Sequence, residues 1–371
     1  MNIMINASNL GGSGGAAQVA DSICMELYKY TQHRFFVVLS ASFSKTRDAI
    51  EGYDNVKVVE YSYPRKDWHS LLTKRNAFLD GLVESERIDC VLTIFGPVKW
   101  VPRCQHLCGI AYPHIIFPHS PFFESMTWLE NKKSMLSNVY MEYLFKRNSE
   151  VFFTENPMVT QIVKNKWKNK KVYTVTNNYN QVFDAPDSWD TYKLPSFAGT
   201  RIFSASSMMA HKNLPITIDV ALLLKKKHPS FSFQFVLTVD EAQFPPIPKE
   251  IKECFVFTGG LHISKIPSLY EQCDVVFQPS LLECFSASYP EAMKMQKPIV
   301  VPNLPFAKGL CEDAAIYYSP LLAEEAADRL HEAATDEILR QRMVESGRKQ
   351  LGKYDTSVLR AEKLIKLCEG L

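Results

Sequence analysis

The sequence predicts an α/β protein with two domains, each built on a parallel β-sheet. Short apolar runs alternate with longer amphipathic segments, a pattern typical of strands joined by crossover helices. A polar stretch with Pro186 and Pro195, residues 184–199, interrupts the alternation, which then restarts. A chain of 371 residues is long enough for two domains of about 180 residues, each with a substantial core.

The first half of the chain, residues 1–183, predicts one Rossmann-like domain. Its candidate helices are residues 17–31, 71–85, 135–146 and 157–166. Its candidate strands are residues 2–6, 35–39, 56–61, 90–94, 106–111, 151–154 and 172–175.

The second half predicts another parallel α/β domain over residues 200–352, after a linker at residues 184–199. Its candidate strands are residues 201–205, 233–238, 254–258, 275–277, 298–301 and 315–318. A last helix is expected over residues 357–368, inside a C-terminal segment of residues 353–371.

Composition excludes several classes of function. The chain has 42 basic and 40 acidic residues, so its net charge of +2 does not suggest a nucleic-acid-binding protein. Nine cysteines are scattered without a Cys-x-x-Cys pair or metal-ligand spacing, which predicts reduced thiols in a cytosolic protein. The first ten residues lack the features of a signal peptide, and no apolar run approaches the length of a transmembrane helix.

One basic tract could contact a membrane surface. Residues 164–171 concentrate lysines around Trp167, and such a patch could hold anionic lipid headgroups. The alternative is a solvated helix end, because the tract is short and has no clear apolar face. We therefore expect at most a peripheral contact with the inner face of a membrane.

Residues 277–293 predict a strand, a loop of small residues and a helix that begins near Pro290. Backbone N–H groups at the start of a helix have no partner within the helix, and they are a natural seat for phosphate. Ser286, Ala287 and Ser288 are small enough to let an anion approach the backbone. The segment therefore predicts a phosphate-binding loop.

Glu283 and Glu291 flank this loop. A carboxylate next to a phosphate would be repelled, so the two acids suggest hydroxyl groups as their partners, on a ribose and on a sugar. Phosphate, ribose and sugar together make a nucleotide sugar. The alternative is a solvated loop followed by an ordinary acidic residue in the first turn of a helix.

The segment resembles the Glu-x7-Glu element of family 4 glycosyltransferases. The match includes residues 279–283, Pro-Ser-Leu-Leu-Glu, and residues 291–293, Glu-Ala-Met. This resemblance implies a GT-B fold, in which two Rossmann-like domains face each other across a cleft and the C-terminal helix crosses back onto the first domain. It also implies that Glu283 holds hydroxyls of the transferred sugar, that Glu291 holds the ribose, and that Phe285, Ser286 and Ala287 form the donor loop.

A second donor-binding element follows the first strand of the second domain. A lysine at the end of a strand can neutralise a diphosphate, and Lys212 matches the lysine that clamps the donor diphosphate in the resembling family. The family's arginine falls at Ser206 or Ser207, so half of that clamp is missing. Gly259 resembles another donor-side turn. The alternative for Lys212 is a solvated surface lysine.

The first domain contributes a glycine-rich loop at residues 11–15 that leads into a helix. Glycines allow a tight turn close to a ligand, so Gly14 and Gly15 are candidates to contact phosphate or sugar. The resembling family has a similar turn, although Gln18 stands where many relatives have arginine. The spacing is not Gly-x-Gly-x-x-Gly, and no acidic residue follows the second strand at Leu39, which argues against nicotinamide dinucleotide binding.

His114 is the candidate sugar-contacting histidine of the first domain. The resembling family has a histidine just after the corresponding strand, and His114 lies two or three residues later. The alternative is an ordinary loop histidine. The aromatic residues Phe117, Phe122, Phe123 and Trp128 could form an acceptor wall, although such side chains are more often part of a core.

The resemblance implies a retaining glycosyltransferase that moves a hexose from a nucleoside-diphosphate sugar to a glycan or lipid-linked acceptor in surface polysaccharide synthesis. The sequence has no Asp-x-Asp, so no metal ion is expected, and the nucleotide sugar is a co-substrate that needs no further cofactor. Two alternatives stay open: a nucleotide-sugar epimerase on the same fold, and a non-catalytic sugar-nucleotide-binding relative.

Overall fold

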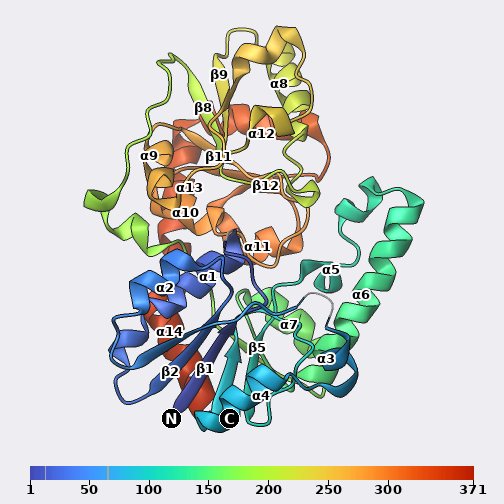
Figure 1. Ribbon diagram of the computed structural model, residues 1–371. Coiled ribbons are helices and arrows are strands. Elements are labelled where there is room, and N and C mark those ends of the chain that lie inside the picture. The colour runs from blue at the N-terminus through green and yellow to red at the C-terminus, as the bar shows by residue number, and fades with distance from the viewer. Residues whose placement is uncertain (13, 65–66) are drawn as a thin grey trace. The chain divides into compact units, whose positions relative to one another are not determined.

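The computed structural model describes residues 1–12, 14–64 and 67–371, and it divides into two compact units (Figure 1). The first unit comprises Met1–Pro118, Thr127–Asn177 and Asp355–Leu371. The second unit comprises His119–Met126 and Asn178–Tyr354. The short segment His119–Met126 therefore belongs to the second unit although its neighbours in the sequence belong to the first.

The first unit is built on a seven-stranded sheet with the order β3-β2-β1-β4-β5-β6-β7, and all its strand pairs are parallel. Each candidate strand of the first half is present, with ends that differ by at most two residues. The strands are β1 Asn2–Ala7, β2 Arg34–Leu39, β3 Val56–Glu60, β4 Cys90–Thr93, β5 Gln105–Gly109, β6 Val151–Thr154 and β7 Lys171–Thr174.

Helices cover both faces of this sheet, which explains why its central strands are rich in apolar residues. Along β1, Ile3 and Ile5 pack into one core, and Met4 between them packs into the core on the opposite face. The helices of the first unit are α1 Gly15–Cys24, α2 Ser44–Ile50, α3 Trp68–Thr73, α4 Ala77–Ser85, α5 Pro113–Ile116, α6 Trp128–Asn148, α7 Pro157–Lys166 and α14 Ser357–Glu369.

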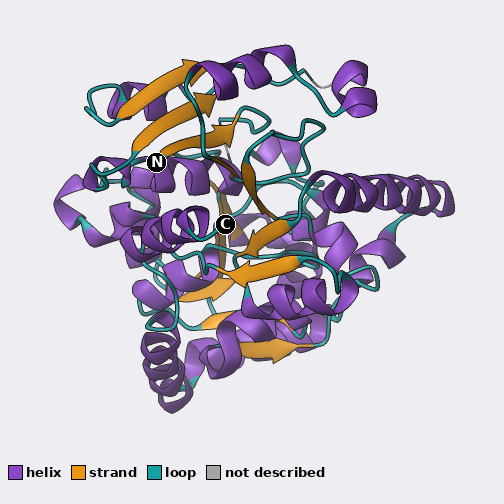
Figure 2. Cartoon of the chain, turned by 90° about the horizontal axis from the view of Figure 1, so that it is seen from below, coloured by secondary structure: helices purple, strands orange, loops and turns teal. Residues whose placement is uncertain are grey.

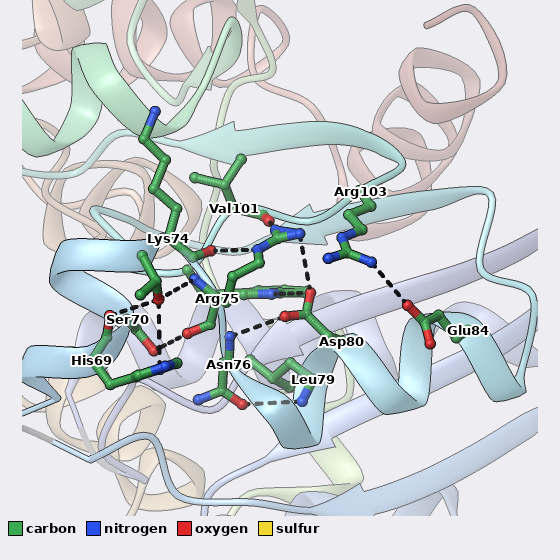
Figure 3. Close-up of polar contacts among 12 residues, drawn as sticks. His69, Ser70, Lys74, Arg75, Asn76, Leu79, Asp80, Glu84, Val101 and Arg103 are labelled. Atoms are coloured by element: carbon green, nitrogen blue, oxygen red, sulfur yellow. Dashed lines mark hydrogen bonds and ion pairs between the residues drawn. The ribbon is translucent and has the colours of Figure 1, made fainter.

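The helix predicted over residues 71–85 is two helices, α3 and α4, and Figure 3 shows the polar contacts at the break. Lys74 ends α3 in the left-handed conformation, with φ of 62°. Asn76 then caps α4, because its side chain accepts a hydrogen bond from the Leu79 N–H at 3.0 Å. Arg75, between them, donates to the carbonyl of Val101. Side-chain capping thus overrides a continuous apolar pattern.

The C-terminal helix α14 packs within the first unit. Leu364, Ile365 and Cys368 join the same core as Ile3 and Ile5. Thr356 caps the helix by accepting a hydrogen bond from the Leu359 N–H at 3.2 Å.

The second unit is built on a six-stranded parallel sheet with the order β10-β9-β8-β11-β12-β13. Each candidate strand of the second half is again present. The strands are β8 Thr200–Ser204, β9 Phe233–Leu237, β10 Phe255–Phe257, β11 Val275–Phe277, β12 Ile299–Pro302 and β13 Ile316–Tyr318. The order reverses between β8 and β11, which makes this pair the topological switch point of the sheet.

Helices of the second unit also cover its sheet, and Figure 2 shows strands enclosed by helices when the chain is seen from below. The helices are α8 Ile216–Lys227, α9 Ile266–Glu271, α10 Ser288–Lys294, α11 Pro305–Cys311, α12 Ala323–Thr335 and α13 Glu337–Leu351. One continuous core lies between α8, α12 and the sheet, with Phe235, Phe277 and Leu330 fully buried in it.

Residues 184–199, the segment expected as a linker, lie along α9 of the second unit. The backbone N–H of Tyr192 donates to Ser268 Oγ at 3.0 Å, and the N–H of Leu194 donates to Gln272 Oε1 at 3.0 Å. Gln272 Nε2 donates back to the Tyr192 carbonyl at 2.6 Å. These bonds attach the extended segment to the second unit.

Candidate active site

The loops that follow β8 and β11 are held side by side at the carboxyl edge of the second sheet. Ser204 Oγ donates to the Phe277 carbonyl at 2.5 Å, and Gln278 Nε2 donates to the Ala205 carbonyl at 3.0 Å. Ser288 Oγ donates to the same carbonyl at 3.2 Å. Open parallel sheets bind their ligands at this position, outside the carboxyl ends of the strands at the switch point.

Lys212 and Glu283 form an ion pair across these two loops. Lys212 ends a short 3-10 helix after β8, and Glu283 lies in the loop after β11. The adjacent backbone is also bonded, because the Leu281 N–H donates to the His211 carbonyl at 2.7 Å. The side chains are only 21% and 11% exposed, so the pair is shielded from water and interacts more strongly than a surface pair.

The helix after this loop begins at Ser288, two residues before the predicted start. Its first backbone bonds run from the Tyr289 N–H to the Ser286 carbonyl at 3.2 Å and from the Glu291 N–H to the Ala287 carbonyl at 3.0 Å. The N–H groups of residues 286–288 precede these bonds and have no acceptor within the helix. They can therefore donate hydrogen bonds to a bound anion.

Phe285 and Ser286 occupy the loop just before this helix. The Phe285 ring is half-buried and meets the Tyr354 ring edge-on, with 6.0 Å between the centroids. Ser286 is buried, and Ala287 is half-buried. Residues 286–288 are Ser, Ala and Ser, so no bulky side chain stands between Phe285 and the start of the helix.

Glu291 is buried on the first turn of α10. Its carboxylate accepts a hydrogen bond from Tyr270 Oη at 3.1 Å. Burial raises the pKa of the Glu291 carboxyl to about 7, and the bond from Tyr270 opposes this shift. Tyr270, on α9, was not predicted from the sequence, because a buried tyrosine in an apolar helix gives no signal of its partner.

We expect Glu291→Gln to reduce the pH dependence of stability. The carboxyl pKa is about 7 in the folded protein and 4.5 in its ordinary state, so the folded protein binds the proton more tightly. The stabilisation is complete below about pH 4.5 and is lost as the pH rises to about 7. In urea denaturation, the decrease in the free energy of unfolding between about pH 5 and about pH 7.5 should be smaller in the variant by about 2 kcal/mol. Equal decreases in both proteins would contradict this prediction.

Ser206 and Gly259 lie along the same edge of the sheet. The Ser206 N–H donates to Thr238 Oγ1 at 2.9 Å, and this hydroxyl donates back to the Ser206 carbonyl at 2.9 Å. Gly259 follows the edge strand β10 with φ of 69°, and a Cβ there would lie 2.9 Å from Asp240 Oδ1. Glycine is therefore required at this turn for backbone geometry. Ser206 is next to the switch point, and Gly259 is two strands away from β8.

The segment His119–Met126, from the first half of the sequence, contacts the two loops of the second unit that carry Lys212 and Glu283. Ser120 Oγ donates to the Leu281 carbonyl at 2.5 Å, and the Phe122 ring lies edge-on to the His211 ring at 6.1 Å. Phe122 and Phe123 are buried, and Trp128 is 71% exposed. Phe122 therefore supports the loop that carries Lys212, a role that the sequence did not indicate because the contact spans distant parts of the chain.

The glycine-rich loop of the first unit follows β1 and leads into α1. Gly14 has φ of 84° and is the residue before α1, and Gly15 is its first residue. Asn9 Nδ2 anchors the loop by donating to the Phe95 carbonyl at 2.8 Å. The loop lies at the carboxyl edge where the first sheet reverses its order, between β1 and β4.

Gly12 in this loop cannot accept a side chain. A Cβ at Gly12 would lie 1.9 Å from the Ser42 carbonyl oxygen, whereas a Cβ at Gly11 would meet nothing within 4 Å. We expect Gly12→Ala to lower the free energy of unfolding by about 1 to 3 kcal/mol through overpacking. Gly11→Ala is the matched control and should change it by less than about 1 kcal/mol. Equal melting curves for the two variants would show that the loop does not approach Ser42 in solution.

His114 lies in the first unit on the short helix α5, after β5. The ring is half-buried, and burial lowers the pKa of His114. The Tyr112 ring lies 5.3 Å from it at an angle of 38°. The imidazole is therefore favoured in its neutral form, which can accept or donate a hydrogen bond to a hydroxyl group.

Apart from Gly259, which follows the edge strand β10, the predicted site residues fall into two groups. Lys212, Glu283 and the segment 285–291 are brought together at the switch point of the second sheet, with Ser206 beside them. Gly14, Gly15 and His114 belong to the first unit. Within residues 1–12, 14–64 and 67–371, no cluster of three or more His, Cys, Asp or Glu side chains could hold a metal ion.

Comparison with known proteins identifies the class of this chain. Residues 199–350, which lie within the second unit, match the family model described as glycosyl transferases group 1. This match identifies the chain as a glycosyltransferase. No curated protein matches the sequence.

Solved structures of similar fold cover the whole chain. A glycosyltransferase from Rickettsia africae ESF-5 superposes with a TM-score of 0.70 and 16% identity, covering 100% of this chain and 97% of the other. WaaG, a glycosyltransferase involved in lipopolysaccharide biosynthesis, gives a TM-score of 0.68 and 11% identity over 98% of each chain. Anabaena HepE in complex with UDP and glucose gives 0.65 and 14%, over 100% and 99%. The fold is that of the GT-B glycosyltransferases, as the sequence predicts.

Proposed function

We propose that this protein is a retaining glycosyltransferase of the family 4 type, which transfers a hexose from a nucleoside-diphosphate sugar to a glycan or lipid-linked acceptor in surface polysaccharide synthesis. The observation that carries the proposal is the pairing of Lys212 and Glu283 at the switch point, beside the N–H groups of residues 286–288, which have no acceptor within the helix. A cation, a carboxylate and an anion-binding helix start are the groups that a nucleotide sugar requires.

The chemistry follows from where charge develops. As the bond between the sugar and the diphosphate breaks, negative charge grows on the leaving phosphate. Lys212 Nζ and the N–H groups of residues 286–288 would stabilise this charge. Their positions are fixed before the donor binds, so little reorganisation is needed during the reaction. Lys212 supplies the cation, and we propose that transfer needs no metal ion.

The two carboxylates would orient the donor through its hydroxyl groups. Glu283 would accept hydrogen bonds from hydroxyls of the transferred sugar, and Glu291 would hold the ribose. The acceptor would bind to the first unit. His114 would contact the sugar, and the loop with Gly14 and Gly15 would contact phosphate or sugar. HepE was solved with UDP-glucose, and WaaG acts in lipopolysaccharide biosynthesis, which supports the substrate class proposed here.

Incubation with nucleotide sugars tests the proposal. A panel of nucleoside diphosphates is first screened for thermal stabilisation, since a bound nucleotide raises the melting temperature by mass action. The protein is then given the matching nucleotide sugars with and without glycan or lipid-linked acceptors. Release of nucleoside diphosphate that depends on an acceptor, with the anomeric configuration kept, and that persists in EDTA, is the expected result. Isomerised donor would indicate an epimerase, and binding without conversion would indicate a non-catalytic relative.

A further inference from the structure

Tyr270 is fully buried next to the carboxylate of Glu291. It lies on α9, and Glu291 lies on α10, a neighbouring helix of the second unit (Figure 1). The Tyr270 hydroxyl is near two acceptors, Glu291 Oε2 at 3.1 Å and the Ser288 carbonyl at 3.4 Å. A phenol hydroxyl has one hydrogen to donate, so it can bond well to only one of them at a time.

The Tyr270 ring is held in place by two aromatic neighbours. The Phe203 ring meets it edge-on at 4.8 Å, and the Phe183 ring meets it at 5.8 Å. Burial raises the pKa of Tyr270 well above its ordinary value, and the Glu291 carboxylate raises it further. The phenol therefore keeps its proton at neutral pH and offers Glu291 a hydroxyl in a fixed position.

Glu291 has one carboxylate oxygen left for a ligand. Oε2 accepts the bond from Tyr270, and over residues 1–12, 14–64 and 67–371 no group donates a hydrogen bond to Oε1. Oε1 is not fully enclosed, so a ligand can reach it. Glu291 is only 5% exposed, so water hydrates this oxygen poorly and a ligand hydroxyl would supply the missing bond.

The other ionisable groups around this pair are neutral, exposed or paired elsewhere. They are Glu271 and Cys273 at and after the end of α9, Asp184, Glu283 and Lys294, and Glu345, Arg348 and Lys349 on α13, which packs against α10. Lys294 pairs with Asp184, Glu283 with Lys212, and Glu345 with Lys349. Arg348 donates to Gln296 Oε1 at 2.7 Å, and Glu271 is exposed. Burial raises the pKa of Cys273 to about 12, so its thiol stays neutral.

We propose that Tyr270 is a positioning residue of the donor site, and that through the Tyr270–Glu291 pair donor binding is linked to the loss of one proton. This inference rests on the function proposed above. While Glu291 is a carboxylate, Tyr270 donates to Oε2 and leaves Oε1 to accept hydrogen bonds from ribose hydroxyls. When Glu291 is protonated, its hydroxyl donates to Tyr270 Oη, and Tyr270 donates to the Ser288 carbonyl instead.

The pH range of this linkage follows from the carboxyl group. Burial raises the pKa of Glu291 to about 7, and the bond from Tyr270 opposes this shift. Ribose hydroxyls bond more strongly to a carboxylate than to a protonated carboxyl, so binding of the donor releases a proton. The dissociation constant of the donor should therefore fall by up to about tenfold per pH unit as the pH rises to about 7, and then level off.

Calorimetric titration of the full chain with a nucleotide sugar, between about pH 5.5 and about pH 8.5, tests the proposal. The ligand is the nucleoside-diphosphate glucose whose nucleoside diphosphate stabilises the protein most, because its diphosphate diester does not titrate in this range. Tyr270→Phe should raise the dissociation constant about five- to tenfold at pH 7 and move the levelling point up by about one pH unit, since the carboxylate loses its donor. Glu291→Gln should remove this part of the pH dependence.

Tyr318→Phe is the matched control. Tyr318 is another fully buried tyrosine of the second unit, and within the part of the chain that the structure describes its hydroxyl has no hydrogen-bond partner. This variant should keep the pH profile of the natural protein and a dissociation constant within about twofold of it. Both tyrosine variants lose a single hydroxyl, so any general effect of that loss on packing appears in the control as well.

The 2′,3′-dideoxy form of the same nucleotide shows whether Tyr270 acts through the ribose. The natural protein should bind it at least about tenfold more weakly, and Tyr270→Phe should add less than about twofold to that loss. A full additional loss would indicate a packing role and overturn the proposal, as would equal pH profiles for the natural protein and Tyr270→Phe. If no nucleoside diphosphate stabilises the natural protein, the proposed function fails together with this inference. Binding of the nucleotide sugar with an unchanged profile in Tyr270→Phe overturns this inference alone.

Discussion

Glu283→Ala is expected to lower the turnover number by about 100-fold or more, corresponding to about 3 kcal/mol of transition-state stabilisation. The carboxylate has two roles in the proposed site. It accepts hydrogen bonds from the transferred sugar, and it fixes the position of Lys212 through the ion pair across the loops. Loss of either role weakens interactions that develop as the leaving phosphate becomes charged. The measurement is steady-state kinetics of acceptor-dependent nucleotide release.

A second pair of variants separates this role from donor binding. Glu291→Gln should mainly raise KM for the donor, because its proposed partner is the ribose and not the reacting sugar. Lys212→Met combined with Glu283→Ala should cost less than the sum of the two single effects, because the residues act as a pair. Near-normal kinetics for both Glu283→Ala and Glu291→Gln would refute the assigned roles. If a variant loses activity and its melting temperature also falls, the residue has a structural role only.

Arg360→Met is expected to lower the free energy of unfolding by about 3 to 5 kcal/mol. Arg360 is only 4% exposed, and its guanidinium donates to Asn177 and Ser22. It thereby joins α14 to α1 and to the end of the chain segment after β7. It is also the cation near the buried carboxyl of Glu155, whose pKa burial raises to about 7. Removal of Arg360 leaves this carboxyl buried without a compensating charge. Urea denaturation measures the effect.

Two controls make this stability prediction specific. Arg342 is exposed on α13, and Arg342→Met should change the free energy of unfolding by less than about 0.5 kcal/mol. Glu155→Gln in the Arg360→Met background should recover part of the loss, because the uncompensated acid is then absent. A loss under about 1 kcal/mol for Arg360→Met, or no recovery in the double variant, would show that the charge of Arg360 near Glu155 does not contribute to stability.

The strands were predictable because most of them are short apolar runs, and the central strands are buried on both sides. In β1, the successive residues Ile3 and Met4 enter opposite cores, so both sides of the strand are largely apolar and the run is visible in the sequence. Helix boundaries were less predictable. Lys74 ends α3 and Asn76 begins α4 through backbone and side-chain geometry, inside a pattern that continues without a break.

The positions of the candidate site residues could be predicted only for those in the loops that follow strands. Lys212 and Glu283 follow β8 and β11, and parallel strands place such loops at one edge. The contacts of Ser120 with Leu281 and of Tyr270 with Glu291 join residues that are far apart in the sequence, and no local pattern indicates them. The exposure of Leu136 and Val139 on α6 was also not predicted from the sequence, because apolar side chains on a helix normally belong to a core.

The most direct test of the central claim is a crystal structure of the protein soaked with the nucleoside diphosphate that stabilises it most. We predict that the diphosphate lies against the N–H groups of residues 286–288, within hydrogen-bond reach of Lys212 Nζ, and that Glu291 contacts the ribose. A diphosphate bound elsewhere, with the start of α10 pointing away from it, would contradict the assignment of the donor site.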